Sequence, residues 1–344
     1  MKKILIILLG LLTLASCSKD DNEVPFPLPP ENATLYMAVN GLPGFPDKIY
    51  DLEGNTVYEC EEGGSIQSLV AEGSDWYALI IRGDGDYCVL KNGNSISLTG
   101  EKIWCFTVEN GIVYTVQENM LSNTIWLCKD FERLYEVPNN AYYFTFSVDH
   151  GNVAMGLYDE KPCYWYNGEI IPIEGLDGGF DWVYGIDITE NYMLITYQDI
   201  PTRNNMYWWH NVNYECPADF QPYASSIVNG HSFILGKKYT SQGVGGINGI
   251  PAVLIDGIET VLNNDLVGFS AVSLASHGLD TYILVRDNTS LYSYIYKNLS
   301  AIKLPDVKTP YSVGPYGAQN SNDGKSNLSA LGIKAIAVVS SRKD

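Results

Sequence analysis

One local pattern recurs along most of the chain: an aromatic or aliphatic strand, a short turn and a second short strand. Several of the turns are Asn-Gly or Asp-Gly pairs, such as 92–93, 167–168 and 256–257. These pairs are typical of two-residue β-hairpins, because both central residues of a type I′ turn need a positive φ. The copies lie at 48–57, 87–96, 125–131, 163–170, 206–212, 253–258 and 294–299. Their spacing of about 40 residues predicts a repeat protein.

Two more strand-like segments precede the hairpin in a typical interval, for example 68–71 and 76–80 before 87–96. Each unit is therefore expected to hold four antiparallel strands, A to D in chain order, with the hairpin joining C to D. The spacing resembles that of tryptophan-aspartate repeat and related β-propellers, although the Gly-His and Trp-Asp signatures of that family are absent. The resemblance covers about residues 33–340 and implies architecture only. A β-sandwich or jelly roll is the rival fold, but it does not require one hairpin in each interval.

The first unit is incomplete, because segment 34–39 supplies only one strand before the first hairpin. The β-branched run at 333–339 follows the last hairpin. Open sheet edges favour unwanted pairing, so the C-terminal run is expected to complete the first blade. The sequence thus predicts an all-β propeller of seven four-stranded blades, closed by the C-terminal strand. Six blades is the alternative.

The N-terminus carries the pattern of an export signal. Lys2 and Lys3 precede an apolar run at 4–14, which is too short to span a bilayer permanently. The following Leu-Ala-Ser-Cys resembles the lipobox of bacterial lipoproteins, which implies that Cys17 becomes the lipidated first residue. An ordinary secretory signal with an incidental cysteine is the alternative. We expect a signal peptide at 1–16, a lipidated and Pro-rich tether at 17–32, and the propeller at 33–344.

The four residues at 18–21, Ser-Lys-Asp-Asp, bear on localisation. They resemble the tag that sends many lipoproteins of the Bacteroidota phylum to the outer face of the outer membrane. The resemblance implies a lipid-anchored protein that faces the cell exterior, with a periplasm-facing anchor as the alternative.

The charge balance limits the partners. The formal net charge is -19, so nucleic acid and bare anionic membrane surfaces are poor partners. A glycan or a surface protein remains, together with the membrane that a lipid on Cys17 would reach. No Cys-x-x-Cys pair occurs, which excludes zinc ribbons and thioredoxin chemistry, and neither a cofactor nor a metal is expected. The other cysteines are predicted to be buried thiols, and a disulfide is the alternative.

In a propeller blade, the B–C and D–A connections share one rim, called the top rim here, and the A–B and C–D turns share the bottom rim. Guanidinium groups, carboxylates and planar aromatic rings are predicted to gather along the top rim, where they suit a sugar or a peptide. The candidate ligand-binding residues are Arg82, Asp84, Trp104, Asp181, Trp182, Asp199, Arg203, Tyr239 and Arg286. The alternative is that these basic residues only pair with neighbouring acids.

The four histidines, His150, His210, His231 and His277, are predicted to lie on the bottom rim of different blades as polar turn residues. The aromatic runs at 164–166 and 207–209 should pack between blades on one face and remain open to stacking on sugars on the other.

The predicted function is non-enzymatic binding or scaffolding at the cell surface, with the top face recognising a glycan or a protein. The alternative is a glycosidase or lyase that uses top-face carboxylates such as Asp84, Asp181 or Asp199. No catalytic residue is assigned.

Overall fold

The computed structural model describes residues 33–39, 46–174, 176, 178–240, 249–287, 292–304, 306–308, 325–327 and 333–340. The predicted signal peptide, Cys17 and the tether lie outside the described residues. All regular secondary structure in the described part is β-strand. That part contains no helix with the length and apolar character needed to cross a membrane.

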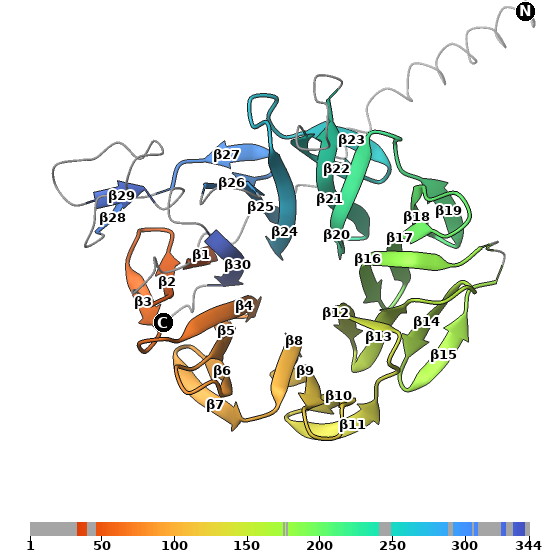
Figure 1. Cartoon of the computed structure of the whole chain (residues 1–344). Helices are drawn as coiled ribbons and strands as arrows, with labels where there is room; N and C mark the ends of the chain where they lie inside the picture. Colours follow the sequence, from red (N-terminus) through yellow and green to blue (C-terminus); the bar gives the residue numbers. More distant parts are fainter. Residues whose placement is uncertain are drawn as a thin grey trace, which may run out of the picture. The chain divides into compact units, whose positions relative to one another are not determined.

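The strands form seven four-stranded antiparallel sheets, the blades of a ring (Figure 1). Blade 1 contains β30 (Ile333–Ser340), β1 (Ala33–Val39), β2 (Lys48–Asp51) and β3 (Thr56–Glu59). Blade 2 contains β4 (Ser65–Glu72), β5 (Asp75–Ile81), β6 (Tyr87–Lys91) and β7 (Asn94–Thr99). Blade 3 contains β8 (Lys102–Glu109), β9 (Ile112–Asn119), β10 (Thr124–Lys129) and β11 (Glu132–Glu136).

Blade 4 contains β12 (Ala141–Asp149), β13 (Asn152–Leu157), β14 (Cys163–Tyr166) and β15 (Glu169–Pro172). Blade 5 contains β16 (Phe180–Thr189), β17 (Tyr192–Asp199), β18 (Asn205–Trp209) and β19 (Val212–Glu215). Blade 6 contains β20 (Phe220–Val228), β21 (His231–Tyr239), β22 (Gly249–Ile255) and β23 (Ile258–Val261). Blade 7 contains β24 (Phe269–His277), β25 (Asp280–Asp287), β26 (Ser293–Lys297) and β27 (Ser300–Ile302). A separate pair, β28 (Asp306–Lys308) and β29 (Lys325–Asn327), follows blade 7. The prediction of seven blades is confirmed.

The C-terminal strand closes the ring, as predicted. β30 pairs antiparallel with β1 from Ala33 opposite Ser340 to Val39 opposite Ile333, so it is strand A of blade 1. Strand A of every blade lies nearest the centre of the ring (Figure 1). Because the first and last strands of the ring, β1 and β30, pair within one sheet, the inner edge of β1 is paired rather than open.

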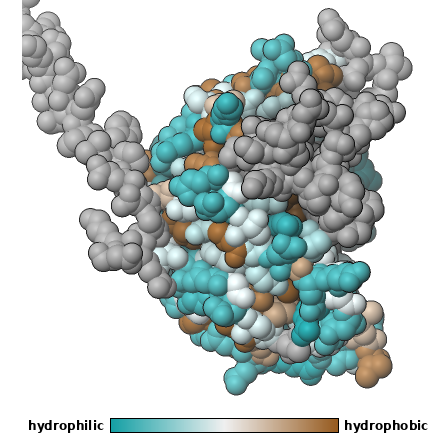
Figure 2. Space-filling view, turned by 90° about the vertical axis from the view of Figure 1, so that its left-hand side faces the viewer, coloured by the Kyte–Doolittle hydropathy of each residue, from teal (hydrophilic) through white to brown (hydrophobic). Residues whose placement is uncertain are grey.

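The hydrophobic core is divided among the interfaces between neighbouring blades. Leu35 and Met37 of blade 1, for example, pack with Leu284 of blade 7, and all three are almost fully buried. Complete burial of such a side chain contributes about 1.5 to 3 kcal/mol. The six described cysteines are free thiols, and burial raises the pKa of Cys60 to about 12. In the side view of Figure 2, hydrophobic residues are scattered over a largely hydrophilic described surface.

The C–D turns of blades 2 to 7 each contain two residues, and both have positive φ. This is the type I′ geometry that the sequence pattern predicts. Even Phe131 (φ 68°) and Leu299 (φ 66°) adopt it, although neither is a typical turn residue. In blade 1 the connection between β2 and β3 is longer, and Asp51 organises it by accepting a hydrogen bond from the Asn55 amide (2.8 Å).

A side chain at the first position of these turns ties the hairpin to strand B of the same blade. In blades 2, 3, 4, 6 and 7 its Oδ1 atom accepts a hydrogen bond from the backbone N–H of the second residue of strand B. The pairs are Asn92 with Trp76, Asp130 with Val113, Asn167 with Val153, Asp256 with Ser232, and Asn298 with Thr281, at 2.8–3.0 Å. We call this contact the turn-to-strand bond. Blade 5 has His210 at the same position.

Candidate functional site

The predicted top-rim residues are distributed over five blades. Arg82 and Asp84 belong to blade 2, Trp104 to blade 3, Asp181, Trp182, Asp199 and Arg203 to blade 5, Tyr239 to blade 6 and Arg286 to blade 7. The four blade 5 residues come from one blade, and in blade 2 Arg82 Nη2 lies 3.8 Å from Asp84 Oδ2. The assignment of these residues to a ligand site stays a prediction.

Within the blade 5 group, the charged side chains contact one another or the backbone. Asp181 forms an ion pair with Arg203. Asp199 is only 8% exposed, and its Oδ2 atom accepts hydrogen bonds from the backbone N–H of Thr202 (3.0 Å) and from its hydroxyl (2.7 Å). Trp182 is 53% exposed. The aromatic ring is therefore the more accessible feature of this group.

Elsewhere on the top rim, the basic residues also pair with acids. Arg82 Nε lies 2.8 Å from Glu61 Oε1. Trp104 Nε1 donates to Glu118 Oε2 (3.1 Å), while Lys102 Nζ lies 3.1 Å from a Trp104 ring centre. Two of the candidate arginines, Arg82 and Arg203, therefore pair with neighbouring acids.

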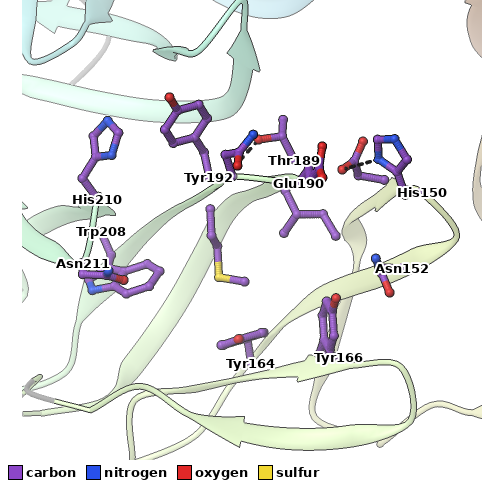
Figure 3. A pocket seen from close by; sticks show the side chains of 14 residues that line it. His150, Asn152, Tyr164, Tyr166, Thr189, Glu190, Tyr192, Trp208, His210 and Asn211 are labelled. Carbon is purple, nitrogen blue, oxygen red and sulfur yellow. Dashed lines mark hydrogen bonds and ion pairs between the residues drawn. The ribbon is translucent and has the colours of Figure 1, made fainter.

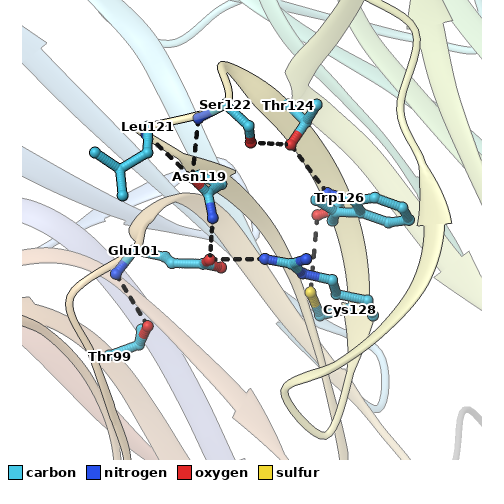
Figure 4. Close-up of polar contacts among 9 residues, drawn as sticks. Thr99, Glu101, Asn119, Leu121, Ser122, Thr124, Trp126 and Cys128 are labelled. Atoms are coloured by element: carbon cyan, nitrogen blue, oxygen red, sulfur yellow. Dashed lines mark hydrogen bonds and ion pairs between the residues drawn. The ribbon is translucent and has the colours of Figure 1, made fainter.

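The B–C connection of blade 3 is the most exposed apolar feature of the top rim described here. Asn119 Oδ1 accepts the backbone N–H groups of Leu121 (3.0 Å) and Ser122 (3.1 Å), and Leu121 is 100% exposed (Figure 4). Glu101 Oε1 accepts hydrogen bonds from Asn119 Nδ2 (3.0 Å) and Arg133 Nη2 (2.8 Å). The polar contacts fix the conformation of this connection, which the sequence did not single out.

A cleft of about 560 Å³ opens on the bottom rim between blades 4 and 5 (Figure 3). We call it the interblade cleft. Its aromatic lining consists mainly of Tyr164 and Tyr166 from β14, Tyr192 from the start of β17, and Trp208 from β18. Its volume lies within the range of about 300 to 1,000 Å³ that small-molecule sites occupy.

Strand alternation explains why these rings face the cleft. Trp165 is 1% exposed and packs on the blade 3 side of β14, so Tyr164 and Tyr166 point to the opposite side, toward blade 5. In β18, Tyr207 and Trp209 pack on the blade 6 side, and Trp208 faces blade 4. The aromatic runs therefore pack between blades on one face and line the cleft with the other.

Turn residues form the polar margin of the cleft. Asp149 and His150 come from the A–B region of blade 4, Glu190 from the A–B turn of blade 5, and His210 and Asn211 from its C–D turn. His150 and His210 stand at opposite ends of the margin, with Glu190 and Tyr192 between them (Figure 3). Both histidines occupy the bottom-rim turns that the sequence predicts.

One hydrogen bond joins blade 2 to blade 3 and blade 3 to blade 4, but it does not join blade 4 to blade 5 among the described residues. Glu72, the last residue of β4, accepts the Gly111 amide of blade 3 (2.6 Å). Glu109, the last residue of β8, likewise accepts the Gly151 amide of blade 4 (2.7 Å). We call this contact the inter-blade bond.

The equivalent residue of blade 4, Asp149, makes no such bond to blade 5 among the described residues. Its Oδ2 atom instead lies 3.0 Å from His150 Nδ1, a contact that raises the pKa of His150. Aspartate is one methylene shorter than the glutamates of blades 2 and 3, so its carboxylate remains on its own turn. The interblade cleft lies beside this turn.

The turn-to-strand bond is also absent from blade 5. His210 has the positive φ of its position (51°), but its ring packs 5.0 Å from the Tyr192 ring and 4.3 Å from the Trp209 ring. The imidazole of His210 thus contacts the aromatic residues beside the cleft. In blades 2, 3, 4, 6 and 7, the Asn or Asp at this position contacts strand B instead.

Nearer the centre of the ring, blades 4 and 5 remain joined. Ser147 Oγ of β12 donates to Asp187 Oδ1 of β16 (2.5 Å), and the Ile227 amide of β20 donates to Asp187 Oδ2 (2.7 Å). Burial raises the pKa of Asp187, and these hydrogen bonds oppose that effect. The cleft is therefore a local opening of the rim between blades that are connected further inside.

One group of side chains in the described part of the chain could coordinate a cation. The ligand atoms of Glu109, Asp149 and His150 lie within 4.8 Å of one another. The Glu109 carboxylate already accepts the backbone N–H groups of His150 and Gly151. The arrangement fits the inter-blade bond, which needs no ion.

Sequence reasoning located the two histidines of the cleft but treated them only as turn residues. One signal was available: the first turn residue is Asn or Asp in the hairpins of blades 2, 3, 4, 6 and 7, and His210 breaks this series. The cleft itself depends on contacts between two blades, which a hairpin pattern does not report.

Neither a protein-family model nor a curated protein matches this chain. Two solved structures from Pyrococcus resemble it. The β-propeller domain of the Trilobed protease from Pyrococcus furiosus, described as having an open velcro topology, is 10% identical with a TM-score of 0.53. The alignment covers 83% of this chain and 95% of that one.

The uncomplexed acylaminoacyl peptidase of Pyrococcus horikoshii is 11% identical with a TM-score of 0.52. This alignment covers 90% of the present chain and 63% of the peptidase, so the chain spans less than two thirds of that enzyme. At such identities, the similarities establish the fold alone: the chain is a seven-bladed β-propeller.

Proposed function

We propose that this propeller is a non-enzymatic carbohydrate-binding protein and that the interblade cleft is its binding site. One observation carries the proposal: the turn-to-strand bond of five other blades is replaced in blade 5 by His210, at the cleft where the aromatic residues Tyr164, Tyr166, Tyr192 and Trp208 gather. Asp149 also lines the cleft, and it lacks the inter-blade bond that blades 2 and 3 make. Departures from a consistent local pattern are expected at functional sites.

The chemistry of the lining suits a sugar. The faces of Trp208 and Tyr164 offer planar apolar surface on which a sugar ring can stack. The lining also includes Asn191 and Asn211, whose side-chain amides carry both donors and an acceptor suited to ring hydroxyls. A concave aromatic surface with a few polar groups is the usual composition of a small-molecule site.

We further propose that the protein is displayed at the cell surface by a lipid on Cys17, in the outer membrane and facing the exterior. The Leu-Ala-Ser-Cys run and the following Ser-Lys-Asp-Asp support this proposal. Labelling of cells with a palmitate analogue tests it: the wild type should carry label, and Cys17→Ala should not. Equal labelling of the two proteins would reject the lipid anchor.

A glycan array followed by calorimetric titration of the strongest binder tests the binding site. Trp208→Ala should weaken binding about tenfold or more, because it removes a stacking surface. Trp182→Ala is the matched control, since that exposed ring lies on the top rim of the same blade. If Trp182→Ala abolished binding and Trp208→Ala did not, the top rim would be the site. Release of reducing sugar from a bound glycan would reject the non-enzymatic assignment.

A further inference from the structure

We infer that the interblade cleft selects sugars that carry a free amine and rejects sugars that carry a carboxylate. This inference rests on the proposed function, because it assigns a ligand class to the same site. Its basis is the set of charges at the cleft. No lysine or arginine is among the fourteen side chains of the lining, which include the carboxylates of Asp149 and Glu190.

The two carboxylates differ in their contacts. Asp149 is engaged with His150, as described above. Glu190 is exposed on the A–B turn of blade 5, and within the described part of the chain its side chain has no hydrogen-bond or ion-pair partner. Glu190 is thus the carboxylate available to a ligand.

Glu190 also lies at the margin of the interblade cleft, where a bound ligand would pass. It lies on the cleft margin between His150 and Tyr192 (Figure 3). The hydrogen bond to Asp149 raises the pKa of His150, and the negative charge of Glu190 raises it further. Both carboxylates therefore contribute negative potential beside His150. Tyr164 and Tyr166 line the same cleft and lie on its opposite side in Figure 3.

The energetic order of ligands follows from these groups. The protonated amine of a hexosamine supplies charge and three donors to a carboxylate, and it is attracted to the faces of aromatic rings. A hexose supplies only neutral hydroxyl groups, and N-acetylation removes the positive charge. The carboxylate of a hexuronic acid would meet Glu190 without a lysine or arginine to neutralise it, and the positive charge of protonated His150 is already balanced by its partner Asp149. We therefore expect hexosamines to bind best, neutral sugars less well and hexuronic acids least.

The test uses the full-length protein and four matched β-1,4-linked tetrasaccharides: of glucose, glucosamine, N-acetylglucosamine and glucuronic acid. Glucose, glucosamine and N-acetylglucosamine differ only at C2, and glucuronic acid differs from glucose only at C6. Isothermal titration calorimetry at pH 6 measures the four affinities. The glycan array described above includes the same four classes of sugar in their galactose-type forms. The glucosamine oligomer should bind about three- to tenfold more tightly than the glucose oligomer.

Glu190→Gln should bring the ratio of the glucosamine affinity to the glucose affinity down to about one. The matched control is Glu62→Gln, which removes an exposed carboxylate from the D–A connection before blade 2. Equal affinity for the amino and neutral sugars in the wild type would overturn the inference while leaving carbohydrate binding intact. So would an amine preference that survived Glu190→Gln. If no sugar of any class bound, or if Trp208→Ala did not weaken binding, the proposed function itself would fail.

Discussion

Lys334 Nζ lies 2.7 Å from Asp47 Oδ2, although 287 residues separate them in the chain. The same Asp47 oxygen accepts the Ile66 amide (2.8 Å), and Lys334 Nζ donates to the Ile66 carbonyl (3.1 Å). One ion pair thus connects the closing strand β30, the B–C connection of blade 1 and the inner strand of blade 2. Both partners are largely buried, so the pair has little competition from water.

Lys334→Met should therefore destabilise the closed ring. The substitution leaves the Asp47 carboxylate without its counter-charge, and we expect the free energy of unfolding to fall by about 2 to 3 kcal/mol. Urea denaturation followed by tryptophan fluorescence measures the change. Lys303→Met, at an exposed position, is the control and should have little effect. An unchanged unfolding midpoint in Lys334→Met would show that closure depends on the β1–β30 pairing alone.

Asp149→Glu should close the interblade cleft. The added methylene gives residue 149 the reach of Glu109, whose carboxylate accepts an amide of the next blade. A new inter-blade bond is expected to raise the free energy of unfolding by about 0.5 to 1.5 kcal/mol and to weaken sugar binding. Denaturation and calorimetry measure the two effects. Asp149→Asn, which changes the charge without adding length, should not raise stability. A longer side chain that changed neither quantity would contradict our explanation of the cleft.

His210→Asn should restore the turn-to-strand bond in blade 5. An asparagine amide tolerates positive φ and could accept the backbone N–H of Met193, the second residue of β17. We expect stability to rise by about 0.5 to 1 kcal/mol, while the ligand loses a contact at the cleft margin. The reciprocal variant Asn92→His, in blade 2, should lower stability by a similar amount. Destabilisation by His210→Asn would mean that the ring contacts of His210 outweigh the missing bond.

Acid should weaken blade 7 through Asp280. Burial alone would raise the pKa of this carboxyl, but hydrogen bonds from Lys297 and Asn298 outweigh it, and the pKa lies below its usual value. The stabilisation is thus fully present above the unfolded pKa of about 3.9 and is lost as the pH falls through the lower folded value.

Asp280→Asn should therefore cost about 1 to 2 kcal/mol at pH 7, and progressively less as the pH falls below about 4. Chemical denaturation from pH 2 to pH 7 tests this, with the exposed Asp265→Asn as control. A deficit that stayed constant over the whole range would exclude the charged form of Asp280 as its cause.

The blade count could be predicted because each hairpin is encoded locally. Asn92, Asn167 and Asp256 mark their turns through a preference for positive φ that belongs to the residue itself. Phe131 and Leu299 show the limit of that rule, since they adopt positive φ without such a preference. There the strand pairing on both sides determines the turn.

The cleft could not be predicted in the same way. It is lined by side chains from two blades, among them Asp149 and Trp208, which are far apart in the sequence. The top-rim prediction relied only on the type of each residue and on the rim to which its connection belongs. Neither reveals that Arg203 pairs with Asp181. Contacts between blades follow from three-dimensional spacing, whereas hairpins follow from adjacent residues.

The pairing of Ala33 with Ser340 has a consequence for engineering. Because the first and last described strands end side by side, a short linker could join them, and the chain could be opened instead at a connection of another blade. Such a circular permutant would keep every strand pair while changing the order of synthesis. Opening the ring at the exposed connection that contains Leu121 would leave the interblade cleft uninterrupted, so a sensor domain inserted there could report on ligand binding without touching the site.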